Sequence, residues 1–269
     1  MRAVAIAVLC VILVAPAPPL FAQGDTADEK TIQRIVQEIE LVPSLYGRGE
    51  GAAKLPKFPA ARLGNYAATE SDALDQSRKL WAVDKAAYAK ANPLRAAIFE
   101  AALETESLGK LKLPMTLSLK MVSAKQKAAI VLQGQAAVGT AIFKLEQVLA
   151  EFQEAAGLRD KEKSARWKAD FDFAHARVQS NLVFLWEYSF TLGQVRADNL
   201  PETTKDHDGW KIVSRPKITV TESKAKTLAK ERGKLLKKIQ DDHPGTPWAH
   251  FAERENAREL GMAWEPKKK

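Results

Sequence analysis

The stretch from Asp160 to Asn199 constrains the fold more than any other part of the chain. It contains no proline and a single glycine, and its apolar residues recur every three, four or seven positions. That spacing predicts an amphipathic α-helix. The second half is apolar nearly all round, so it must be covered on most of its sides. We therefore expect this helix to lie at the centre of a helical bundle. Its apolar stripe comprises Trp167, Phe171, Ala174, Val178, Leu182, Leu185, Leu192 and Val195.

A second long helix is expected from Ser123 to Gly157, with Leu132 on its inward stripe. Only a few residues separate it from the helix that begins near Asp160, so the two must pack antiparallel as a hairpin. Gly134 and Gly139 lie inside the second helix, where each costs up to about 1 kcal/mol relative to alanine. We expect both glycines to permit close helix packing.

The rest of the chain also reads as helical, because Ala, Leu, Lys, Glu and Gln dominate and alternating Val, Ile and Thr are nearly absent. The expected fold class is all-α: an elongated antiparallel bundle built on the long hairpin. Further helices are expected at 25–41 (capped by Thr26), 71–91, 93–108 (with Leu103 inward), 222–242 and from Pro247 onward. Extended pieces are expected at 110–119, 210–213 and 217–220, a polar loop at 203–209, and an apolar tail at 260–264 that folds back.

The first residues indicate export. Arg2 precedes an apolar run from Ala3 to Ala15, and prolines 16, 18 and 19 follow. Thirteen apolar residues are too few to span a bilayer, so we expect a secretory signal peptide cut near Ala22, the alternative being an uncleaved anchor. The only cysteine, Cys10, would leave with it. A periplasm or cell envelope suits such a chain.

These patterns divide the chain into five expected segments. They are a signal peptide (1–22), an N-terminal helix with a flexible arm (23–69), the helical bundle with its hairpin (70–200), a linker (201–221), and a C-terminal helix pair with a basic tail (222–269).

Two sets of residues carry resemblances. The turn His243-Pro244-Gly245-Thr246-Pro247-Trp248-Ala249 is similar to the helix-turn-helix of tetratricopeptide repeats, in a single copy. Together with the segments 166–172, 187–190, 209–211 and 260–264, it resembles the C-terminal region of secreted planctomycete proteins. That resemblance covers roughly Ser123 to Pro266. It implies a helical fold and export, and it brings no catalytic residues.

Candidate chemistry is sparse. Asp172 and His175 lie three residues apart on one helix and could present two metal ligands, or they could form a polar helix face. Glu187 lies inside the apolar run, which would raise the pKa of its carboxyl, unless it meets a basic side chain or a wet strip of the helix. No setting for a nucleophile is recognisable. We expect no catalytic residue, no cofactor and no metal.

The sequence therefore favours an exported, non-catalytic scaffold that docks an envelope protein through its C-terminal helix pair. The candidate contact residues are Lys230, Lys234, Lys237, Trp248, Phe251 and Trp264. Because the formal net charge is +8 and lysines crowd the stretch Lys224–Lys238, one alternative is a binder of anionic envelope polymer or lipid. A second alternative is an unrecognised enzyme or metal protein. Nucleic acid is not expected as a partner in this compartment.

Overall fold

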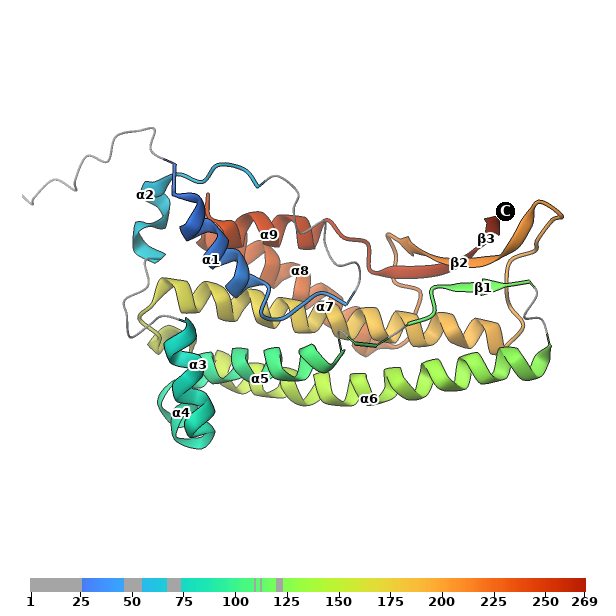
Figure 1. The fold of residues 1–269 in the computed structure, drawn as a ribbon, viewed down its shortest axis with the longest axis horizontal. Helices are drawn as coiled ribbons and strands as arrows, with labels where there is room; N and C mark the ends of the chain where they lie inside the picture. The colour runs from blue at the N-terminus through green and yellow to red at the C-terminus, as the bar shows by residue number, and fades with distance from the viewer. Residues whose placement is uncertain (1–25, 46–54, 67–73, 109, 112, 120–122) are drawn as a thin grey trace, which may run out of the picture.

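The computed structural model describes residues 26–45, 55–66, 74–108, 110–111, 113–119 and 123–269 (Figure 1). The predicted signal peptide, the cleavage near Ala22 and much of the expected flexible arm lie outside these residues. Most of the described residues are helical, which confirms the predicted helical bundle. A small sheet is added to it.

The long hairpin is present. Helix α6 (Ala124–Ala156) and helix α7 (Ala165–Arg196) run side by side in opposite directions (Figure 1). Ser123 caps α6 through a reciprocal capping box with Gln126. The side chain of Ser164 accepts from the backbone N–H of Trp167, so α7 begins five residues later than predicted. A short 3₁₀ turn, η3 (Arg159–Lys161), joins the two helices.

The two glycines of α6 differ in what they face. A Cβ atom added at Gly134 would lie 2.6 Å from Cδ1 of Leu192 on α7, so this glycine does permit close packing within the hairpin. A Cβ added at Gly139 would meet nothing within 4 Å. The expectation that Gly139 permits close packing against another helix of the same chain is therefore wrong among the described residues.

Helix α7 lies at the centre, as predicted. Nearly every side chain from Arg166 to Tyr188 is buried. Around it pack α5 (Pro93–Leu108), α6, α8 (Ser223–Asp242), α9 (Pro247–Asn256) and α1 (Glu29–Ile39). On the covering helices two large apolar residues that were predicted to face inward are exposed: Leu132 (71%) and Leu103 (45%). Val131, which was predicted on the same stripe of α6 as Leu132, does turn inward, one position and about 100° away.

The N-terminal elements correct two boundaries. Helix α1 starts at Glu29 because Asp28, and not Thr26, caps it by accepting from Thr31 N (2.9 Å). The helix expected at 71–91 is divided into α3 (Leu74–Val83) and α4 (Lys85–Ala91), because Asp84 caps α4 through the N–H of Ala87. Between α1 and α3 in sequence lie α2 (Ala60–Leu63) and the 3₁₀ turn η1 (Gly64–Tyr66).

A three-stranded antiparallel sheet packs at the C-terminal end of α7 (Figure 1). Its strands, in order, are β1 (Thr116–Ser118), β2 (His207–Arg215) and β3 (Gly261–Lys268). The apolar tail folds back as predicted, pairing Trp264 with Ile212. The expectation of an extended piece at 217–220 is wrong, since no strand forms there. Strand β2 begins inside the expected polar loop and lies within the expected linker.

Glu187 fastens three parts of this architecture together. Its fully buried carboxylate accepts from the backbone N–H groups of Thr219 (2.8 Å), Val220 (2.7 Å) and Met262 (3.0 Å). The hydroxyl of Thr219 donates a fourth hydrogen bond (2.6 Å). A buried carboxylate is stable only when such donors replace its water. Glu187 therefore holds the chain before α8 and the start of β3 against α7.

This arrangement predicts the effect of Glu187→Gln. Glutamine keeps the size of the side chain but turns one acceptor oxygen into an amide nitrogen that faces N–H donors. The free energy of unfolding should fall by about 3 kcal/mol. Guanidinium unfolding followed by circular dichroism measures it. The matched control is Glu231→Gln on the exposed face of α8, which should change stability by less than about 0.5 kcal/mol. Equal losses in the two variants would contradict the assigned role.

Candidate functional site

The metal pair proposed from the sequence does not form. Asp172 turns toward Arg159, whose Nε lies 2.8 and 2.9 Å from the two carboxylate oxygens. His175 instead stacks on Phe152, with ring centroids 5.2 Å apart, and its Nε2 lies 3.3 Å from the amide nitrogen of Gln179. Burial lowers the pKa of His175 to about 4. The ring is thus a neutral part of the core at physiological pH.

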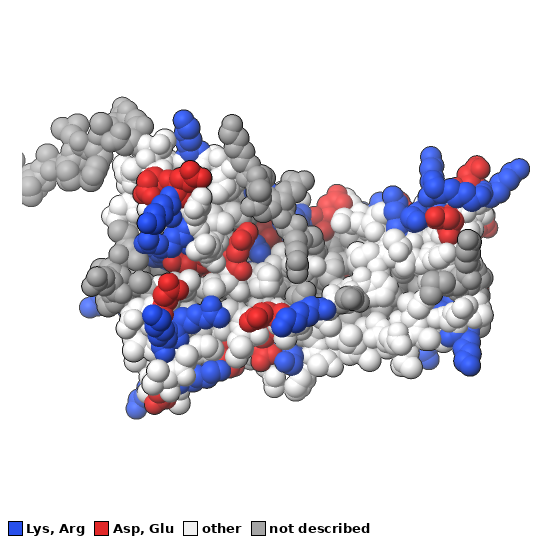
Figure 2. Space-filling view, viewed as in Figure 1, with Lys and Arg blue, Asp and Glu red and all other residues white. Residues whose placement is uncertain are grey.

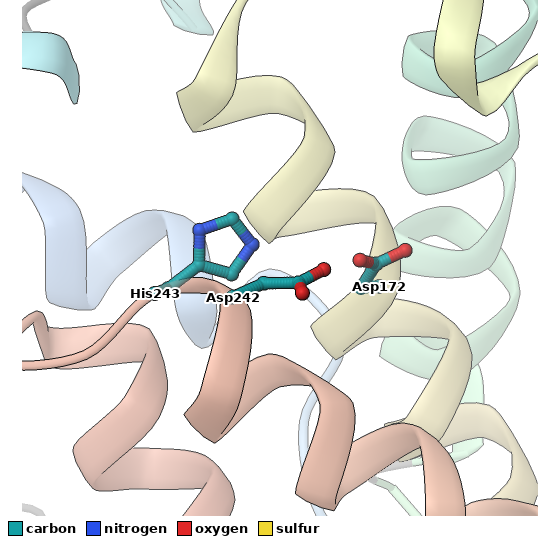
Figure 3. A group of neighbouring side chains, drawn as sticks. All are labelled: Asp172, Asp242 and His243. Carbon is teal, nitrogen blue, oxygen red and sulfur yellow. The ribbon is translucent and has the colours of Figure 1, made fainter.

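Asp172 meets two other potential ligands, Asp242 and His243, at the C-terminal end of α8 (Figure 3). One ligand atom from each residue lies within 4.8 Å of the others. Asp172 and His243 are buried, while Asp242 is partly exposed. No pattern in the sequence indicates this group, because about 70 residues separate Asp172 from the other two.

His243 is held on one side only. Its Nδ1 lies 2.7 Å from the hydroxyl of Tyr66, whose ring stacks on Trp248. Its Nε2 is buried and has no hydrogen-bond partner among the described atoms, and Figure 3 shows the imidazole ring beside the two carboxylates. Burial lowers the pKa of His243, an effect that the nearby Asp172 and Asp242 oppose.

Arg159 forms ion pairs with both carboxylates of this cluster. Its guanidinium binds Asp172 through both Nε and Nη2 (2.5 Å from Nη2 to Oδ2) and reaches Asp242 at 3.3 Å. These contacts raise the pKa of Arg159. An internal cation therefore already balances both carboxylates, and a metal ion would have to displace it. The arrangement ties η3, α7 and α8 together, and we assign it that structural role.

Other buried polar groups of α7 also face inward partners. The indole N–H of Trp248 donates to Asp170 (2.7 Å), and burial, with the nearby Glu38, raises the pKa of Asp170 well above its ordinary value. Glu187 meets neither a basic side chain nor solvent, because backbone N–H groups satisfy it. These carboxyl groups are occupied by contacts that hold the fold.

Two aromatic residues proposed as a docking surface are inside the chain. Trp248 is fully buried beneath Tyr66, and Trp264 is buried with its indole N–H donated to the carbonyl of Thr191 (2.8 Å). Only Phe251 is partly exposed, with its ring edge-on to Phe173. The expectation that Trp248 and Trp264 face a partner is therefore wrong, since both rings complete the core. The apolar faces of helices α8 and α9 pack against α7.

The lysines of α8 form an exposed row. Lys226, Lys230 and Lys234 are exposed at intervals of four residues, on one face of the helix, and make no ion pair with any residue that the structure describes. Lys237 extends the row and pairs with Asp241 (2.8 Å). We call these four residues the lysine row. The basic tail is less available, because Lys267 pairs with Asp208 (3.1 Å) across the sheet.

A hollow of about 970 Å³ lies where α4 meets α5, beside the turn before α7. Lys90, Lys161 and Lys163 line it, and all three are exposed. Arg95 lies in the same wall and is paired with Glu162 (3.2 Å). This hollow is basic, and none of the residues singled out from the sequence lines it.

The most unusual surface is the outer side of α6, which we call the α6 face. Nine exposed residues run along it: Lys125, Ala129, Leu132, Ala136, Gly139, Phe143, Gln147, Ala150 and Glu154. Leu132 (71%) and Phe143 (62%) are large apolar side chains in solvent. No charged residue occurs from Ala128 to Phe143. In Figure 2 the lower right of the molecule, over α6, is accordingly almost white.

The apolar character of α6 extends beyond the core. By length and composition it could cross a membrane, a test that core helices of soluble bundles also pass. Only 28% of its most apolar window is buried in the chain, however. The sequence signal was present, because Leu132 and Phe143 lie eleven residues apart, which is three helical turns. Leu132 was assigned to the inward stripe, and Phe143 was not singled out.

Comparison with known proteins gives no relative: no protein-family model, no curated protein and no solved structure matches the chain.

The environment of His175 predicts a pH dependence. In the unfolded chain the pKa of His175 is near 6.5, so the ring is protonated below that pH. In the folded chain the ring stays neutral until the pH falls to about 4, so the proton binds preferentially to the unfolded state between these values. Stability from this group is complete above pH 6.5 and is lost as the pH falls toward 4. Between pH 7 and pH 4 the chain should lose about 3 kcal/mol more than the His175→Gln variant. Urea unfolding at both pH values measures this difference.

The control for that measurement is His207→Gln, at the partly exposed start of β2. This variant should keep the pH dependence of the unchanged chain. If His175→Gln also keeps it, the ring is not held neutral by burial and the assignment is wrong.

Proposed function

We propose that this chain is an exported, helical interaction protein that carries out no reaction and docks a protein partner through the α6 face. The observation that carries the proposal is the exposure of Leu132 and Phe143 on a helix whose other side is core. Export is supported by the apolar run and prolines of residues 1–22. The docking surface differs from the C-terminal helix pair expected from the sequence, since Trp248 and Trp264 are buried in the core.

The physical reason is the cost of apolar surface in water. Covering a fully exposed Leu or Phe side chain is worth roughly 1.5–3 kcal/mol, and the α6 face has one of each. A contiguous uncharged helix face is typical of helix-to-helix docking, in which anchors recur at helical spacing. The small residues between the anchors, Ala136 and Gly139, let a partner helix approach closely.

Photo-crosslinking tests the proposal directly. A benzophenone amino acid at position 143, in cells that make the protein, should give a specific protein adduct on irradiation. The matched control is position 83 on α3, where Val83 is 87% exposed and lies outside the α6 face. If neither position gives an adduct, or if both give the same diffuse pattern, the α6 face is not a docking surface.

The lysine row supports a second candidate function, the binding of an anionic envelope polymer or lipid surface. Within the part of the chain that the structure describes, three of its four lysines have no carboxylate partner, so their attraction for a polyanion is not balanced there. Contacts of this kind weaken with added salt, because counterions screen exposed charges within about 10 Å at 0.1 M.

Retention on vesicles containing anionic lipid, or on an acidic polysaccharide column, measures this binding. Reversal of Lys226, Lys230 and Lys234 to glutamate should abolish retention at low salt. The control is the same change at Lys90, Lys161 and Lys163, which alters the net charge equally and leaves the row intact. If both variants lose retention equally, the net charge of the protein explains the binding, and a specific role for the lysine row is excluded.

A further inference from the structure

The α6 face follows the helix without drifting. Its nine residues advance in steps of four or three, covering 29 residues in eight steps, which is 3.6 residues per step. A row with the period of a straight α-helix stays on one side. At 1.5 Å per residue, the row from Lys125 to Glu154 is about 43 Å long. A partner that fits it should therefore be a straight helix of similar length.

The order of residues along the row is self-complementary. If a second α6 packs antiparallel, with a twofold axis between Gly139 and Thr140, eight of the nine members of the row meet another member and Gly139 lies at the axis. Phe143 then lies over Ala136 of the other copy, and Ala129 lies over Ala150. Leu132 meets the aliphatic part of Gln147. The largest side chain of the row thus faces a small one, as close packing requires.

The charges at the two ends agree with the same alignment. The row begins with Lys125 and ends with Glu154, both exposed and neither in an ion pair with a described residue. In the antiparallel arrangement Lys125 of each copy lies opposite Glu154 of the other. Opposite charges at such flanking positions set the orientation of paired helices. A parallel pairing would instead bring like charges together.

Gly139 supplies an independent observation. Within a helix it costs up to about 1 kcal/mol relative to alanine, and in the described chain its open side touches nothing. Gly134, by contrast, accommodates Leu192 of the same chain. Gly139 lies next to the proposed twofold axis, where the backbones of two copies would come closest. A glycine at this point permits the close approach of a helix from another molecule, because no described residue of the same chain approaches it.

From these observations we propose that the partner of the α6 face is a second copy of this chain, bound as an antiparallel α6–α6 dimer. This inference rests on the proposed docking function of the α6 face and specifies its occupant. The dimer covers Leu132 and Phe143 in both copies and aligns the four end charges.

Sedimentation equilibrium of the purified full chain tests the proposal. The chain should dimerise at tens of micromolar, and the combined change Leu132→Ser and Phe143→Ser should weaken association more than a hundredfold. Leu80→Ser with Val83→Ser removes two exposed apolar residues from α3 and should leave association unchanged. Circular dichroism confirms that each variant is folded, as expected for substitutions at exposed positions.

Charge reversal then tests the alignment. Lys125→Glu and Glu154→Lys should each weaken the dimer about tenfold, because each places two like-charged pairs across the interface. The double variant carrying both changes should recover the original affinity. Recovery requires an antiparallel partner that is itself this chain, since a different protein would keep its own charges.

A chain that is monomeric at 100 μM, or a dimer that is indifferent to Phe143→Ser, overturns the inference. Failure of the double reversal to restore association overturns it as well. These failures remain distinct from failure of the proposed function: a monomer whose position 143 crosslinks to a different protein loses the self-association but keeps the docking surface. A monomer that binds neutral lipid vesicles through Phe143 contradicts both.

Discussion

The fold depends on satisfying the polar side chains that α7 buries. A buried polar group without a partner costs roughly as much as a hydrogen bond gains, and a buried charge costs more. On α7 four of these groups receive partners from different covering segments. Asn181 binds the backbone at Pro43 and Leu45, Ser180 accepts from Arg232 of α8, Asp170 accepts from Trp248 of α9, and Glu187 binds the start of β3. Apolar burial supplies most of the stabilisation, while these contacts fix where each segment lies.

Much of the architecture could be predicted because it follows from local rules. The 3.6-residue period identified the hairpin, and serine N-caps explain where its two helices begin. The sheet was harder, because the alternation of Met262 and Trp264 is too short to be distinguished from a loop. The face of α6 was misjudged because Val131 and Leu132 are both apolar and both were placed on the inward stripe, although neighbouring residues of a helix point about 100° apart. The Asp172 cluster could not be predicted at all, since its members meet only after α8 returns along α7.

The two sides of α6 show how one helix can serve two surfaces. Gly134 and Gly139 are five residues apart, and so face in different directions. The first admits Leu192 and brings α7 close, while the second is open. A helix with apolar residues on both sides has too little polar surface for a simple surface helix. Its composition is better understood as that of a helix placed between two neighbours.

The contacts of Glu187 have a consequence for the order of assembly. The carboxylate lies in the second half of α7, yet one of its donors, the N–H of Met262, is made 75 residues later. Until the ribosome has passed Met262, the nascent chain can offer the carboxylate only the donors of Thr219 and Val220. The set of donors around Glu187 is therefore complete only when synthesis is nearly finished. Truncation before this point should leave a chain that proteases recognise as open.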